Sequence, residues 1–155
     1  MTELVLQLYS QFTRLSVFPF VVCLALLGAS SFADSHPSSV GRYAEITPHG
    51  SEEIVDLLNR VAEYQQSGEL FDDPIVIMLH GPEAVVFTRK KYSMYKPVVD
   101  LAEKLDMEGV IDLQICEAWM AVNRITPNEI PSFIKPVPYG QAVIEALEEV
   151  GYIRF

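Results

Sequence analysis

Apolar residues along the chain fall into two alternating patterns, which are short runs of strand length and longer segments with helical spacing. The clearest run is Pro-Ile-Val-Ile-Met-Leu-His-Gly at 74–81, and a second occupies Val110–Ile115 after Gly109. The first run shows no alternation of apolar and polar positions. Because strands that are buried on both faces have this composition, the run predicts a strand in a sheet covered by helices.

Three longer segments carry apolar residues three and four positions apart, as one face of a helix requires. Ser51 is expected to cap the first of these helices. Pro97 suits the first turn of the second helix, and Gly151 follows the end of the third. The predicted helical faces are Ile54, Leu57, Leu58 and Val61; Val98, Leu101, Ala102 and Leu105; and Val143, Ile144, Leu147 and Val150.

Shorter segments complete the alternation of strands and helices. Arg42–Ile46 is a candidate first strand, 117–123 a short helix, and 134–137 a short extended segment. Prolines inside this last segment and on both sides of it confine it to a margin of the sheet. The length suits one small domain, and the order of elements predicts an α/β layered fold with a mainly parallel sheet.

An apolar segment near the N-terminus has the order of a secretory signal. The uncharged run Val17–Leu27 follows Arg14, and small residues up to Ala33 follow the run. This order is typical of a cleaved export signal, so we expect a periplasmic or secreted protein. The expected organisation is a signal peptide at 1–33, a flexible lead-in at 34–41 and a single domain at 42–155.

Two alternatives to this leader stay open. A permanent membrane anchor needs roughly 20 apolar residues, and the run is shorter than that. The residues before Arg14 are many for the start of a signal, so the true start could lie downstream of Met1. Contact with a membrane is expected only through an uncleaved leader.

Charge and cysteine content narrow the classes of partner. A net charge of −10 would repel phosphates, so nucleic acid is not an expected partner. The one basic run, Arg89–Lys91, is expected to lie in a solvated loop that also contains Tyr92 and Tyr95. Cleavage of the leader would remove Cys23 and leave Cys116 as a lone thiol, which cannot form an internal disulfide.

Two chemically capable side chains fall where predicted strands end. His80 closes one strand and Cys116 closes the next. Ligands gather at the carboxyl ends of strands in open α/β sheets, so these side chains would share one edge if their strands are neighbours. Cys116 also precedes a short helix, whose positive end favours the nucleophilic thiolate, although Glu117 works against this.

Each of the two residues also has a purely structural interpretation. Cys116 could be a small buried residue that ends a strand, since free cysteine is often buried. His80 could cap a turn through one ring nitrogen. No metal is expected, because these two residues do not complete a tetrahedral set of ligands, and no cofactor is expected, because no glycine-rich phosphate cradle follows a strand.

The order of the segments resembles the DsrE/DsrF-like family of small sulfur-relay proteins, and most of all its stand-alone, poorly characterised branch. The resemblance covers roughly 42–154. The segments that carry it are Ile75–Val85 with its His-Gly turn, Gly109–Cys116, 137–140 (Val-Pro-Tyr-Gly) and Leu147–Tyr152 with its Gly-Tyr end.

The resemblance implies a flavodoxin-like three-layer fold and assembly into trimers or hexamers. In sulfur-carrying members a cysteine after a strand accepts sulfur as a persulfide, and Cys116 matches that position. His80 matches the His-Gly turn of the branch. Two departures concern the donor and acceptor: relay members commonly carry a basic stretch after the cysteine, where this chain has only Arg124, and they act in the cytoplasm.

Three functions follow as hypotheses. The first is an exported sulfur carrier in which Cys116 accepts sulfane sulfur and His80 assists, with an unknown donor and acceptor. The second is a non-catalytic ligand-binding or oligomeric assembly module, in which Cys116 packs. The third is a redox sensor that forms an intermolecular disulfide through Cys116.

Overall fold

The computed structural model describes residues 40–46, 49–68 and 72–155. The expected signal peptide at 1–33 and most of the expected lead-in at 34–41 lie outside these residues. No helix in the described ranges is long and apolar enough to cross a bilayer.

Five strands and four α-helices follow one another in the described ranges, with three short 3-10 helices between them. The strands are β1 (Arg42–Glu45), β2 (Ile75–Leu79), β3 (Ile111–Cys116), β4 (Lys135–Val137) and β5 (Ile153–Arg154). The α-helices are α1 (Ser51–Gln66), α2 (Tyr92–Met107), α3 (Glu117–Val122) and α4 (Gly140–Glu149). The 3-10 helices are η1 (Pro82–Phe87), η2 (Arg89–Lys91) and η3 (Pro127–Glu129).

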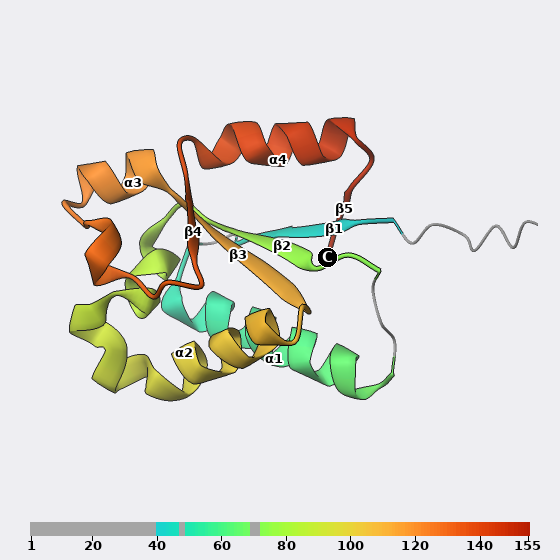
Figure 1. Cartoon of the computed structure of the whole chain (residues 1–155), viewed down its shortest axis with the longest axis horizontal. Helices are drawn as coiled ribbons and strands as arrows, with labels where there is room; N and C mark the ends of the chain where they lie inside the picture. The colour runs from blue at the N-terminus through green and yellow to red at the C-terminus, as the bar shows by residue number, and fades with distance from the viewer. Residues whose placement is uncertain (1–39, 47–48, 69–71) are drawn as a thin grey trace, which may run out of the picture. The chain divides into compact units, whose positions relative to one another are not determined.

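The strands form one sheet in the order β4-β3-β2-β1-β5, and every pair of neighbours is parallel. Figure 1 shows α4 on one face of this sheet and α1 and α2 on the other. The expected α/β class with a parallel sheet is confirmed, as a flavodoxin-like three-layer sandwich. The proline-flanked segment forms β4 at one edge, as predicted.

The two faces of the sheet are buried to different extents. The face toward α1 and α2 carries the main core, which includes Ile75, Ile77 and Leu79 of β2 and Ile111, Leu113 and Ile115 of β3. The face toward α4 carries a smaller cluster of four buried residues, Tyr43, Val76, Met78 and Ile144. Alternation along each parallel strand therefore sends even-numbered residues of β2 and β3 toward α4.

The start of α2 differs from the prediction. The helix begins at Tyr92, so Tyr92 and Tyr95 are helical residues and not part of a loop. Its backbone departs from helical geometry at Tyr95 (φ −111°, ψ 17°), two residues before Pro97. Pro97 has no N–H to donate to the preceding turn, which explains the kink, and it stands near the start of the segment after the kink.

Two helix ends also differ from the prediction. Gly50 occupies the N-cap of α1, and no side chain hydrogen-bonds to this cap, so Ser51 is the first helical residue. Val150, which the spacing placed on the buried face of the last helix, follows α4 and is 74% exposed. The helix ends at Glu149, so Val150 no longer keeps the helical phase that the pattern assumed.

Candidate functional site

His80 and Cys116 lie at the ends of neighbouring strands, as the sequence predicted for adjacent strands. β2 and β3 pair in parallel, and the last pair in their register is Leu79 with Ile115. His80 and Cys116 each follow that pair by one residue. Because neighbouring strands are about 4.8 Å apart, both residues lie at the same edge of the sheet, Cys116 as the last residue of β3 and His80 as the residue after β2.

The connections that follow β3 and β4 lie on opposite faces of the sheet. After β3 the chain passes through α3, whose Met120 is buried in the core on the α1 and α2 side. After β4 it passes to the opposite face, where α4 lies (Figure 1). The strand order reverses between β1 and β5, so the topological switch point, the usual position of a ligand crevice in such sheets, lies there and not beside Cys116. Cys116 pairs with Val137 of the edge strand β4.

Cys116 is a free thiol and is 5% exposed. It is the N-cap of α3, and the first residue of α4 packs against it. A Cβ built on Gly140 would lie 3.4 Å from the Cβ of Cys116 and 2.8 Å from Sδ of Met78. Negative charge that develops on the sulfur would therefore face the positive end of the α4 dipole, but a reagent must displace the start of α4 to reach it.

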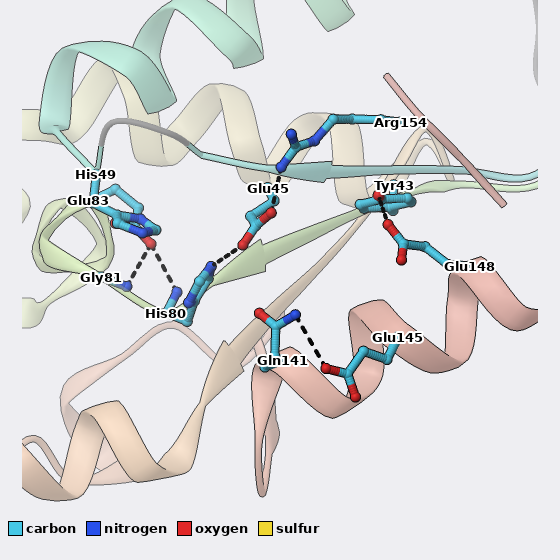
Figure 2. A network of polar contacts seen from close by, with 10 residues as sticks. All are labelled: Tyr43, Glu45, His49, His80, Gly81, Glu83, Gln141, Glu145, Glu148 and Arg154. Carbon is cyan, nitrogen blue, oxygen red and sulfur yellow. Dashed lines mark hydrogen bonds and ion pairs between the residues drawn. The ribbon is translucent and has the colours of Figure 1, made fainter.

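The imidazole of His80 lies in a network of charged groups (Figure 2). Its Nε2 is 3.1 Å from Oε1 of Glu45, in a geometry that does not make a hydrogen bond. The other oxygen of Glu45 accepts a hydrogen bond from Arg154. The side chains of His80 and Glu45 are 19% and 21% exposed, so the pair is shielded from water but still reachable.

A second carboxylate, that of Glu83, organises the turn after β2. Glu83 is fully buried. Its Oε1 accepts hydrogen bonds from the backbone N–H groups of His80 and Gly81, at 2.8 and 2.7 Å. Its Oε2 is 3.1 Å from Nδ1 of His49. A buried carboxylate is costly unless hydrogen bonds satisfy its oxygens, and these three bonds do so.

The two described histidines meet edge to face. The ring centroids of His49 and His80 are 4.7 Å apart, with an angle of 81° between the ring planes. The structure thus joins two histidine–carboxylate pairs into one cluster, His49 with Glu83 and His80 with Glu45.

Sequence reasoning proposed His80 and Cys116 as site residues but did not predict the residues that surround His80. Glu45 and Arg154 come from the ends of β1 and β5, which sit beside each other only in the folded sheet. Glu83 had a local signal, an acid in the first turn of a helix that starts with Pro82. His49 had none, because the segment before α1 has no regular pattern.

Three other features were considered as sites: a metal centre, the basic run and a cavity. Among the described residues no cluster of three or more His, Cys, Asp or Glu side chains could hold a metal ion. The basic residue Lys90 has an 81% exposed side chain and pairs with Glu129 at 3.0 Å. A cavity of about 620 Å³ lies between α1 and β1, away from Cys116, and Glu45 is the residue of the His80 cluster that reaches its wall.

Comparison with known proteins supports the fold. No model of a protein family matches the chain, and no curated protein matches it. The structure is similar to that of MTH1491, a protein of unknown function from Methanobacterium thermoautotrophicum, with a TM-score of 0.57. The two share 14% sequence identity, and the similarity covers 75% of this chain and 95% of the other. At this identity the similarity establishes a shared α/β architecture and carries no information on activity.

Proposed function

We propose that this protein is an exported, DsrE-like sulfur carrier that accepts sulfane sulfur as a persulfide on Cys116. The observation that carries the proposal is the placement of His80 and Cys116 at the carboxyl ends of the neighbouring strands β2 and β3, at the same edge of the sheet. A thiol and a base at such a position form the minimum that thiol chemistry needs.

The transfer step is an exchange between sulfur atoms. His80 accepts the proton of the Cys116 thiol, and the thiolate attacks the outer sulfur of a small persulfide or polysulfide donor. A new S–S bond forms at Cys116 while the S–S bond of the donor breaks. The donor leaves as a thiolate and takes a proton, so Cys116 holds one extra sulfur atom and no outside oxidant is required.

The burial of Cys116 sets a condition on this reaction. Because Gly140 and Met78 pack against the cysteine, the turn between β4 and α4 must move before a donor reaches the sulfur. The reaction is therefore expected to be slower than that of an exposed thiol.

Intact mass measurement tests the proposal. The protein that begins at residue 34 is exposed to polysulfide, beside a Cys116→Ser control. A gain of one or more sulfur atoms that reductant reverses, and that the control lacks, is the expected result. A His80→Gln variant should load more slowly by about 100-fold or more, the usual contribution of a general base. If Cys116 gains no sulfur until the chain is unfolded, the proposal fails.

A second function is favoured by a different observation. An apolar groove of about 420 Å³ lies along α4, lined by Pro138, Tyr139, Ala142, Val143, Ala146 and Leu147. Tyr139 is 60% exposed beside it. In this account the protein is a binding or assembly module, a trimer or hexamer in which Cys116 only packs. Light scattering during size exclusion would show the oligomer, and an Ala146→Glu substitution in the groove would dissociate it.

A further inference from the structure

Glu83 holds the residue that the proposed transfer uses as its base. Its Oε1 binds the backbone N–H groups of both His80 and Gly81, so one oxygen fixes the peptide that carries the imidazole. Gly81 cannot be replaced without disturbing this arrangement. A Cβ at that position would lie 2.5 Å from Oε2 of Glu83 and 2.6 Å from the His49 ring.

The same carboxylate acts on the ring of His80 by a second route. Oε2 of Glu83 lies 3.1 Å from Nδ1 of His49. The two atoms are within hydrogen-bond distance, and Nδ1 of His49 is the donor when the carboxylate is ionised, because an ionised carboxylate only accepts hydrogen bonds. The plane of the His49 ring is thereby set, and its edge-to-face contact at 4.7 Å limits how the ring of His80 can rotate.

Glu45 lies against His80 from another direction. Its carboxylate faces Nε2 at 3.1 Å, while the ring of His49 meets the imidazole at 81°. The imidazole of His80 is thus oriented by groups from two other segments, β1 and the residues just before α1.

We infer that Glu83 is a positioning residue for His80, acting through the 80–81 backbone and through His49. The inference rests on the proposed function, because it assigns Glu83 a role in presenting the base to Cys116. Glu83 does not touch the sulfur, and its effect on the reaction passes entirely through His80.

The chain contains a matched control for the purely structural role. Glu129 also caps a 3-10 helix: its carboxylate accepts hydrogen bonds from the backbone N–H and the hydroxyl of Thr126. It does not contact His80 or His49 in the structure. If Glu83 only caps η1, then Glu83→Gln should behave as Glu129→Gln does.

Two variants separate the routes by which Glu83 acts. Glu83→Gln keeps an oxygen for the backbone N–H groups but removes the charged acceptor from His49. His49→Phe keeps an aromatic ring against His80 and leaves the turn bonds of Glu83 intact. The readouts at one fixed pH are the ring-nitrogen chemical shifts of His80, identified with His80→Gln, and the rates of sulfur loading and alkylation of Cys116.

The expected result is a shifted His80 signal in both variants and a fall of about tenfold in the two Cys116 rates, with neither change seen in Glu129→Gln. Unchanged His80 signals, or rates within about twofold of the wild type, would overturn the inference. If Glu83→Gln does not fold, His49→Phe decides by itself. If the wild type loads no sulfur, the proposed function fails, and the His80 shifts still test the positioning role.

Discussion

Gly140, the first residue of α4, rests directly on Cys116. A Cβ at position 140 would lie 3.4 Å from the Cβ of Cys116 and 2.8 Å from Sδ of Met78, and Met78 is itself 1% exposed. The start of α4 therefore approaches the sheet this closely only because residue 140 has no side chain.

Gly140→Ala is accordingly expected to lower the free energy of unfolding by about 1–3 kcal/mol, the usual cost of overpacking. Urea denaturation would measure it. The neighbouring exposed residue provides the control, because Gln141→Ala should change stability by about 0.5 kcal/mol or less. The displaced helix start should also speed alkylation of Cys116. Equal stability of the two variants would show that the packing at this point is looser than the structure indicates.

Tyr43 is expected to titrate later than an ordinary tyrosine. The pKa of its hydroxyl is raised above 10.0, first by its hydrogen bond to Glu148 and then by burial. A folded-state pKa above the unfolded value stabilises the fold below about pH 10, and the contribution is lost as the pH rises through the folded pKa.

Tyr43→Phe should therefore reduce the free energy of unfolding by about 1 kcal/mol at neutral pH. Ultraviolet absorbance of tyrosinate should show one late-titrating tyrosine in the wild type, absent in this variant and shifted down in Glu148→Gln. A wild-type curve in which no tyrosine titrates late would contradict the raised pKa.

Glu129 should stabilise the fold at neutral pH and stop doing so in acid. Its pKa is lowered from 4.5 to about 2, chiefly by the backbone N–H of Thr126 and then by Lys90. Because the folded-state pKa lies below the unfolded value, its contribution is present above about pH 4.5 and is lost as the pH falls toward 2. Glu129→Gln should be less stable than the wild type at pH 7, and the difference should vanish near pH 2. Denaturant titrations at both pH values, with Glu149→Gln as a control, would detect a pH-independent difference if this is wrong.

Arg154 is expected to affect His80 more than it affects stability. It pairs with Glu45, and its side chain is 53% exposed, so Arg154→Gln should cost less than about 1 kcal/mol. The same change leaves the carboxylate beside His80 without its guanidinium. The ring signals of His80 in NMR spectra should shift in this variant and stay in place in Arg89→Gln. Signals that move equally in both would reflect net charge alone.

Hydrophobic patterning predicted most of the fold, because a strand buried on both faces is a continuous apolar run that can be recognised in the local sequence. β2 and β3 appear where unbroken apolar runs occur, and prolines correctly marked β4 as an edge strand. The prediction for α2 missed the helical turn that begins at Tyr92, before the kink at Tyr95, whereas Pro97 does stand near the start of the segment after the kink.

Only the candidate site residues that directly end or follow a strand could be predicted from the sequence. His80 and Cys116 follow their own apolar runs, and they share one edge of the sheet because β2 and β3 are neighbouring parallel strands. Glu45 and His49 contact His80, and Arg154 contacts Glu45, but these residues come from separate segments that the fold brings together. No local pattern in one sequence encodes such a meeting.

The pairing of β5 with β1 has a consequence for how the molecule folds and opens. Glu45 and Arg154 are 109 residues apart in the sequence, so the chain must close a long loop before this edge forms. Docking of β5 on β1 adds little stability, because both residues of β5 are exposed. β5 should therefore dock late in folding and be among the first segments to detach in the native state, with rapid amide hydrogen exchange at Ile153 and Phe155. Each such opening would separate Glu45 from Arg154. The electrostatic environment of His80 would therefore fluctuate whenever β5, which is distant from His80 in the sequence, detaches from the sheet.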